Sequence, residues 1–142
     1  MCMTNIIVFI YNTIIMQYPH LWKDLVLPGL ILLALDYGYL TLTKSTFEIQ
    51  IAAVQRVSLQ FRVLGAIVCY ALLIFGLYFF ILRTHRSPLE ALLFGIIIYG
   101  VYDSTNYATL KKWKWELAVM DTLWGGVLLA LTTMIVYKLV KV

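Results

Sequence analysis

Three aspartates lie within stretches of the sequence that are otherwise apolar enough for a lipid bilayer. Asp36 is in LLALDYGYL, Asp103 in YGVYDSTN and Asp121 in LAVMDTLWGG. Each acid costs about 2.5 to 3.5 kcal/mol near the bilayer centre if it faces lipid, so we expect all three to face other polar groups. Buried carboxyl groups of this kind either hold helices together by hydrogen bonds or bind and relay protons or cations. A lipid or small-molecule site is a third interpretation, and the residues leave all three open.

The three acids are expected to lie at one depth. Apolar segments joined by short loops alternate in direction, so the end of the first, the end of the third and the start of the fourth face the same side. At about 1.5 Å per residue, the acids lie roughly 8 to 12 Å from those ends. Helical periodicity adds neighbours from the third and fourth segments. The predicted buried polar cluster consists of Asp36, Tyr99, Tyr102, Asp103, Asn106, Asp121 and Trp124.

The helix faces that carry these acids should converge. On the first segment the predicted face consists of Gly29, Leu33, Asp36, Leu40 and Thr43. Small residues let membrane helices approach each other closely. We expect this role for Gly65 and Cys69 on the second segment and for Gly125 and Gly126 on the fourth.

The composition is that of a membrane protein. The 142 residues are 63% hydrophobic and only 13% charged, with a mean hydropathy of +0.89. A water-soluble domain of this size needs far more charge on its surface. The net charge is +4, but the basic residues flank apolar segments instead of lining one face, so no nucleic-acid partner is expected.

Four stretches, 25–43, 63–82, 89–110 and 117–137, approach the roughly 20 residues that cross a bilayer. They are predicted to be helices, because a strand in lipid would leave its backbone groups unpaired. The short connections after the second and third stretches predict an antiparallel four-helix bundle, an all-α fold. The expected organisation is an N-terminal interfacial arm over 1–24 and a transmembrane domain over 25–142.

Two sequences resemble helix N-terminal capping boxes. SPLE supplies Ser87 as the cap, Pro88 at the first helical position and Glu90 three residues after the cap. STFE repeats the pattern at Ser45 and Glu48, so a second helix is predicted over about 46–61. Because that stretch is amphipathic, we expect it to lie in the membrane interface or to lead into the second span.

The sequence KKWKW follows the third apolar stretch. Lysine and tryptophan at the end of a span are ordinary anchors at the bilayer interface, whereas a basic aromatic loop can also bind nucleic acid. We favour anchoring. The predicted interface anchors are Lys111, Lys112, Trp113, Lys114 and Trp115.

Positive charge does not orient the protein in the membrane. Five basic residues are assigned to one side of the predicted bundle and six to the other, so the positive-inside rule gives no direction. The sequence contains no metal-ligand spacing, phosphate-binding loop or pairing of a nucleophile with a base, so no cofactor, no metal and no enzymatic activity are expected.

The stretch YGVYDSTNYATLKKW followed by DTLWGG resembles a family of small predicted four-helix integral membrane proteins of unknown function, with bacterial, algal and large DNA virus members. The shared pattern places an acid, an aromatic residue and Leu in the first segment, then two polar motifs in the second half. In this sequence its positions are Asp36, Tyr39, Leu40, Tyr102, Asp103, Thr105, Asn106, Asp121, Trp124 and Gly125. Tyr39 stands where bacterial members usually have Trp, and the first connecting segment and the arm are also unlike theirs. The resemblance therefore implies the viral branch.

Two functions are compatible with these observations. The first is a non-enzymatic structural component of the internal lipid membrane of a large DNA virus particle, in contact with lipid and with capsid or membrane proteins. The second is a small proton or cation carrier that uses Asp36, Asp103 and Asp121 as a relay. Because four helices are few for alternating access, such a carrier is expected to work as an oligomer.

Overall fold

The computed structural model describes residues 21–140. The predicted arm over 1–24 therefore lies outside the described residues, apart from its last four. The described elements are α2 (Leu21–Gln55), α3 (Val63–Leu77), the short π-helix η1 (Tyr78–Leu82), α4 (Pro88–Thr109) and α5 (Trp115–Val140). Residues 21–140 are all-helical with irregular connections, as the sequence predicts.

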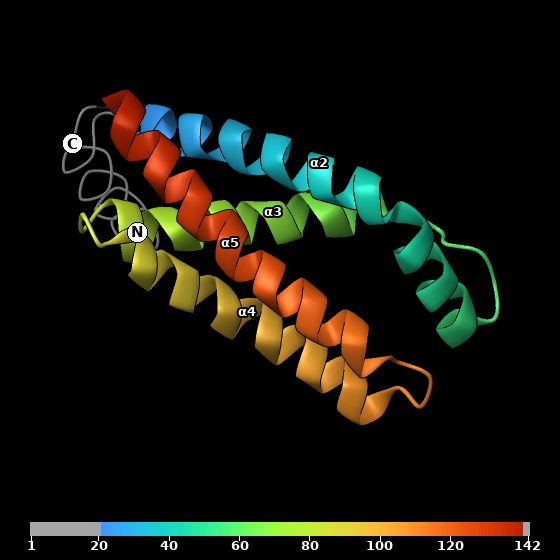
Figure 1. Cartoon of the computed structure of the whole chain (residues 1–142). Helices are drawn as coiled ribbons and strands as arrows, with labels where there is room; N and C mark the ends of the chain where they lie inside the picture. Colours follow the sequence, from blue (N-terminus) through green and yellow to red (C-terminus); the bar gives the residue numbers. More distant parts are fainter. Residues whose placement is uncertain (1–20, 141–142) are drawn as a thin grey trace, which may run out of the picture.

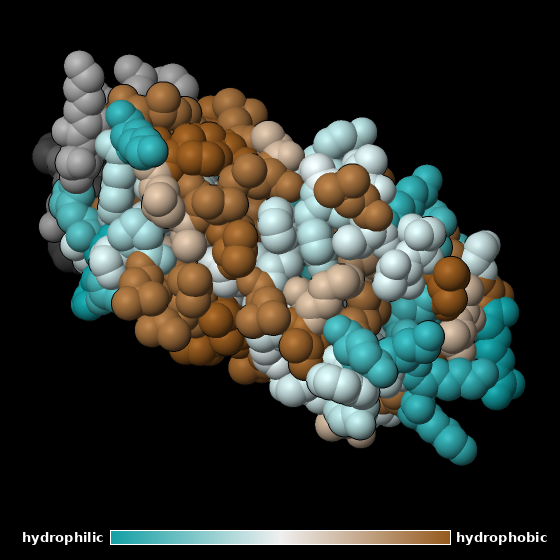
Figure 2. Space-filling view, in the orientation of Figure 1, coloured by the Kyte–Doolittle hydropathy of each residue, from teal (hydrophilic) through white to brown (hydrophobic). Residues whose placement is uncertain are grey.

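Three of these segments are long and apolar enough to cross a membrane: Asp24–Gln55, Val63–Leu82 and Trp115–Val140. The helix α4 is not among them, and its second half carries Asp103 and Asn106. Figure 2 shows apolar side chains over much of the visible surface, with hydrophilic groups gathered near the ends of the molecule. Apolar side chains that face outward over this much of a small protein suit a lipid environment.

The four helical segments form an elongated bundle in which α5 is central (Figure 1). Its most extensive contact is with α4, and it also packs against α2, while α3 and η1 pack against α2. The described core is formed by Leu32, Leu73, Leu77, Tyr78, Ile81, Leu82, Ala91, Leu128, Leu129 and Val136. The chain reverses between α4 and α5 within five residues, so these two helices run antiparallel (Figure 1).

Glycines allow α4 and α5 to approach to backbone contact. A Cβ atom added to Gly95 would overlap the backbone carbonyl of Gly125, and one added to Gly126 would lie 2.7 Å from Ile96 Cγ1 and 3.0 Å from the Leu92 carbonyl oxygen. The predicted packing role of Gly125 and Gly126 is therefore confirmed. The same prediction is wrong for the second segment. A Cβ atom added to Gly65 would meet nothing within 4 Å, and Cys69 is exposed.

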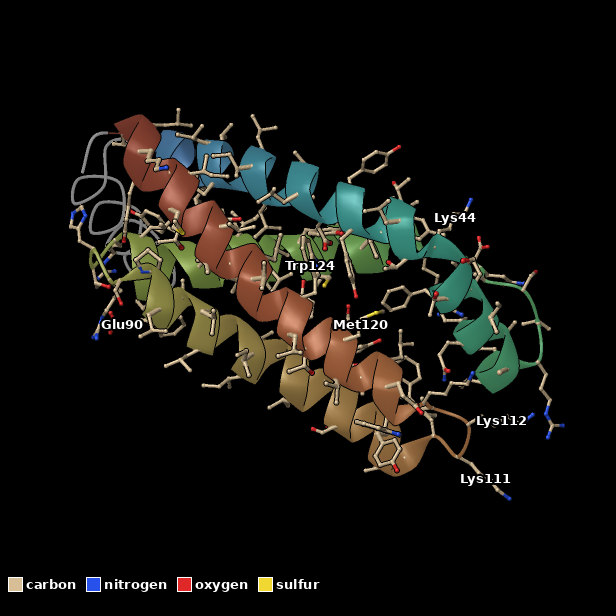
Figure 3. All side chains as sticks on the ribbon, viewed as in Figure 1. Lys44, Glu90, Lys111, Lys112, Met120 and Trp124 are labelled. Carbon is tan, nitrogen blue, oxygen red and sulfur yellow. The ribbon has the colours of Figure 1, made fainter. Side chains whose placement is uncertain are left out.

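The first span and the predicted amphipathic helix are one continuous helix. The helix α2 has 35 residues and ends at Gln55, so Ser45 is inside a helix and does not cap one, and the helical prediction is wrong beyond Gln55. No proline or glycine follows Gly38 within α2, and continuing the helix keeps its backbone hydrogen bonds intact. The ribbon bends near Lys44 (Figure 3), and the chain leaves the helix at Arg56, which has a φ of 60°.

The predicted cap of α4 is present in full. The Ser87 side chain accepts a hydrogen bond from the Glu90 backbone N–H at 3.3 Å, and the Ser87 N–H donates to Glu90 Oε2 at 2.9 Å. Pro88 occupies the first helical position, where its missing N–H leaves no bond unmade. Arg86 adds an ion pair with Glu90 at 2.7 Å.

This difference between two similar serines is testable. We expect Ser87→Ala to lower the free energy of unfolding by about 1 kcal/mol, because it removes the helix cap. Ser45→Ala should leave stability unchanged or raise it slightly, since alanine favours a helix interior more than serine does. Denaturant titration of the two variants in detergent micelles measures both values. Equal losses would contradict the assignment of the cap to Ser87 alone.

The predicted inward face of α2 is right at Gly29 and Asp36, which are buried, and wrong at Leu33 and Leu40. Leu33 and Leu40 are exposed, whereas Leu32 is fully buried. Asp36 is the one acid of α2 that faces the bundle, with Leu32 one turn before it and Tyr39 about one turn after it. The inward face is therefore Gly29, Leu32, Asp36 and Tyr39, which recur at helical spacing.

Candidate functional site

Asp36 joins three helices. Its Oδ2 accepts a hydrogen bond from the Tyr70 hydroxyl of α3 at 2.5 Å, and its Oδ1 accepts one from Trp124 Nε1 of α5 at 2.9 Å. Only 6% of its surface is exposed. Hydrogen bonds to a carboxylate are stronger than those between neutral groups, and burial strengthens them further. Asp36 is therefore the point at which α2, α3 and α5 are held together.

Asp121 forms the reciprocal contact. It accepts a hydrogen bond from the Tyr39 hydroxyl at 3.2 Å, so each of α2 and α5 supplies one acid and one aromatic donor. The rings of Tyr39 and Trp124 stack with their centroids 4.4 Å apart and their planes at 10°. We name this set of Asp36, Tyr39, Tyr70, Asp121 and Trp124 the carboxylate–aromatic clamp. Figure 3 shows Trp124 in the middle of the bundle.

The spacing in the two helices explains the geometry of the clamp. Asp36 and Tyr39 are three residues apart on α2, as Asp121 and Trp124 are on α5, so each pair projects from one helix face. In antiparallel helices the acid of one pair lies opposite the aromatic residue of the other. The stacked rings then fill the space between the two hydrogen bonds, at a separation typical of favourable aromatic contacts.

Asp103 is buried next to the clamp without belonging to it. Its side chain is 1% exposed, and neither carboxylate oxygen has a hydrogen-bond partner among residues 21–140. The Trp113 ring nitrogen and the Thr122 hydroxyl approach the carboxylate without forming well-directed hydrogen bonds. Asp121 interacts electrostatically with both Asp36 and Asp103 and so connects the three acids.

Further polar atoms near this end of the bundle lack partners. Asn106 Nδ2, Trp113 Nε1 and Gln50 Oε1 are buried and make no hydrogen bond within the described residues. The Gln50 amide nitrogen donates to the Lys112 carbonyl oxygen at 2.8 Å and attaches the end of α2 to the α4–α5 turn. Buried polar groups normally have partners, so this end of the bundle is less completely hydrogen-bonded than the clamp.

The structure brings together most of the predicted cluster. Asp36, Asp121 and Trp124 meet directly, and Asp103 adjoins them. Tyr99 packs its ring over Gly125, at the contact of α4 and α5. Asn106 is half-buried, and its side-chain nitrogen is fully buried.

Tyr102 requires a correction. The sequence places it in the buried cluster, but its side chain is 59% exposed. It lies one position before Asp103, and 100° of helix rotation turns it away from α5. Its ring meets the edge of Trp113, with centroids 6.4 Å apart.

The predicted interface anchors divide into two groups. Lys111, Lys112 and Lys114 are exposed around the α4–α5 turn, and Trp115 is also exposed. Figure 3 shows Lys111 and Lys112 at the polar end of the molecule. Trp113 is different, because it packs against Tyr102 and buries its ring nitrogen. It belongs to the surroundings of Asp103 more than to the outer surface.

Sequence reasoning missed Tyr70, and it gave Tyr39 no part in the site. A signal was present in both cases, since a tyrosine hydroxyl inside an apolar span needs a hydrogen-bond partner. Tyr70 lies on the one predicted span that carries no acid, so no polar partner on its own helix marked it. Among residues 21–140, no group of three or more His, Cys, Asp or Glu side chains could hold a metal ion.

Comparison with protein families identifies one family that matches most of the chain. The family model described as "Predicted membrane protein (DUF2177)" matches residues 22–138. The chain belongs to this family. All five residues of the clamp, and Asp103 with them, lie within the part that matches the DUF2177 family. No curated protein and no solved structure matches the chain.

Proposed function

We propose that this DUF2177 protein is a non-enzymatic integral membrane protein whose helices are held together by the carboxylate–aromatic clamp. One observation carries the proposal: Asp36 uses both carboxylate oxygens to bind donors from two other helices. Asp121 is likewise engaged with Tyr39. Acids engaged in this way stabilise a fixed helix arrangement, which is what a structural component of a membrane requires.

We further propose that α4 is the fourth membrane crossing. Leu89, Leu93, Ile97 and Val101 recur every fourth residue, and each is more than half exposed. This outward stripe is entirely apolar, as lipid contact demands, while the opposite face carries Gly95 and Asp103 toward α5. The end of α2 beyond the bend, with Lys44 and Glu48 exposed, lies in the interface in this arrangement.

The membrane that we propose is the internal membrane of a large DNA virus particle. Support comes from the resemblance to viral members at Tyr39 and in the first connecting segment. The proposed partners are lipid and neighbouring capsid or membrane proteins, with a second copy of the chain as another candidate. Mass spectrometry of the membrane fraction of purified particles tests this role. Absence of the protein from that fraction, while a known membrane protein of the particle is recovered, would end the proposal.

A second candidate is a proton or cation carrier, and the unpartnered Asp103 favours it. Liposomes that contain the purified protein are loaded with a pH gradient or a sodium gradient, and its decay is followed. A carrier dissipates one gradient, and Asp103→Asn abolishes the effect while Asp24→Asn, an exposed acid at the start of α2, does not. Decay no faster than in empty liposomes, for wild type and both variants, would exclude this function.

A further inference from the structure

We propose that Asp103 is a proton-binding site that is reached from the lipid-facing side, between α4 and α5. The starting observation is an acidic side chain that is 1% exposed and has no hydrogen-bond partner for either oxygen among the described residues. This inference concerns Asp103 alone and holds whether or not the protein is a structural component of a membrane. If the protein is instead a proton carrier, it requires a proton-binding site of this kind.

Among residues 21–140, no positive charge compensates Asp103. The ion pairs Lys44–Glu48 and Arg86–Glu90 lie on exposed surfaces away from it. The titratable groups that interact with Asp103 are Tyr102 of its own helix, Asp121 of α5 and Tyr39 of α2, one acid and two phenols. None of them can supply a compensating charge.

Asp103 has two neutral donors nearby, the Trp113 ring nitrogen and the Thr122 hydroxyl, but no cation among the described residues, and we infer that an acid in this position binds a proton. Transfer of an unpaired carboxylate into an apolar interior is so unfavourable that the group becomes neutral instead. A metal ion is the other way to neutralise it, but sodium or calcium needs several oxygen ligands around it. Residues 21–140 offer no cluster of three acids, histidines or cysteines. A proton needs only one oxygen, and competition by sodium in the experiment distinguishes the two ligands.

A cavity leads to the site from outside the bundle. It has a volume of about 260 Å³, and its walls come only from α4 and α5. The lining residues include Gly100, Asp103, Tyr107, Trp115, Val119 and Leu123. Tyr107, Trp115 and Leu123 are each more than half exposed, so the opening faces outward. In a membrane this opening meets lipid, and an apolar molecule can enter it without crossing the bundle.

The other two acids differ from Asp103 in a way that the experiment can use. Both oxygens of Asp36 accept hydrogen bonds, and one oxygen of Asp121 does. Asp103 is the one of the three that lines the cavity between α4 and α5, and neither of its oxygens accepts a hydrogen bond within the described residues. Because Asp103 is itself buried, the cavity wall must move before a reagent from the lipid bonds to it. Asp36 and Asp121 do not line this cavity, so a reagent that enters there and requires a neutral acid should choose Asp103.

Dicyclohexylcarbodiimide is such a reagent. The acid proton passes to one carbodiimide nitrogen, and a carboxyl oxygen bonds to the central carbon. The acyl group then migrates from that oxygen to the other nitrogen and leaves a stable N-acylurea. Nothing is oxidised or reduced, and no group departs. The full chain, reconstituted into phosphatidylcholine vesicles, is treated with the reagent, and its peptides are examined by mass spectrometry.

We expect most of the label on Asp103, with Asp36 and Asp121 largely unmodified. Labelling should fall about tenfold for each pH unit above the point at which the acid ionises. Sodium should not protect the site. Asp103→Asn should remove this label, and if that variant does not fold, the distribution among the three acids in the wild type still decides. Label spread evenly over the acids, no label on Asp103, or protection by sodium would each overturn the proposal. Gradient decay in liposomes is a separate result, so failure of the carrier function leaves this test intact.

Discussion

Alanine at Gly95 will separate α4 from α5 and lower the free energy of unfolding by about 3 kcal/mol, at the upper end of the usual cost of overpacking. The added methyl group would overlap the Gly125 carbonyl and lie 2.8 Å from the Cα of Gly126. These neighbours are backbone atoms, so no side-chain rotation can make room. The two helices must move apart along the most extensive interface of the bundle. The dispersion attraction between their side chains across that interface is then reduced.

A matched glycine provides the control. Gly38 is also within a helix, but a Cβ atom added there would meet nothing within 4 Å. Gly38→Ala should be neutral or stabilising by up to about 1 kcal/mol, because alanine has the higher helix propensity. Unfolding of both variants in mixed micelles, followed by circular dichroism, gives the two values. If Gly95→Ala and Gly38→Ala behave alike, the close approach of α4 and α5 is wrong.

Asp36→Ala will have the second large effect, a loss of about 2 to 4 kcal/mol. It removes the acceptor of two interhelical hydrogen bonds, each worth about 1 to 2 kcal/mol in membrane peptides. The Tyr70 hydroxyl and the Trp124 ring nitrogen would then lack their acceptor. The same change at the exposed Asp24 should have little effect.

A double-mutant cycle separates the clamp from general damage to the core. Trp124→Phe removes the donor and keeps an aromatic ring that can stack on Tyr39. In combination with Asp36→Ala it should cost less than the sum of the single changes, because the bond can be lost only once. Strict additivity would show that the two side chains do not stabilise each other.

The apolar stretches of the sequence predict the helices closely. Predicted 63–82 is the observed Val63–Leu82, and predicted 89–110 and 117–137 correspond to Pro88–Thr109 and Trp115–Val140. Length, helical periodicity and the Ser87 cap are local properties, so a sequence contains them. The depth of the three acids follows from the same arithmetic, because short loops fix the register of neighbouring helices.

The rotation of α2 could not be predicted in the same way. Leu32, Leu33 and Leu40 are all apolar and all lie about one turn from Asp36. In a water-soluble protein the polar side of a helix faces water, so the opposite, apolar side is its inner face. In lipid, outward residues are as apolar as inward ones, so the pattern does not distinguish them. Tyr39 and Tyr70 reveal the answer only through the acids that they bind.

The immediate surroundings of Asp103 were also beyond the sequence pattern. Lysine and tryptophan after a span are typical of interface anchors, and that description fits Trp115. Trp113 instead buries its ring nitrogen near Asp103, because the α4–α5 turn reverses the chain within five residues and folds this ring back against α4. Which of two neighbouring tryptophans faces the bundle depends on the backbone of the turn, which residue types alone do not determine.

The continuous helix α2 gives the molecule unequal ends. Its 35 residues extend about 50 Å, whereas the hydrocarbon of a bilayer is about 30 Å thick. In the proposed arrangement the excess beyond the bend lies among the head groups of one leaflet, where the Gln50 amide donates a hydrogen bond to the Lys112 carbonyl of the α4–α5 turn. A protein layer that assembles against that leaflet would meet this helical segment together with the head groups, whereas the other leaflet would present the turn before α4.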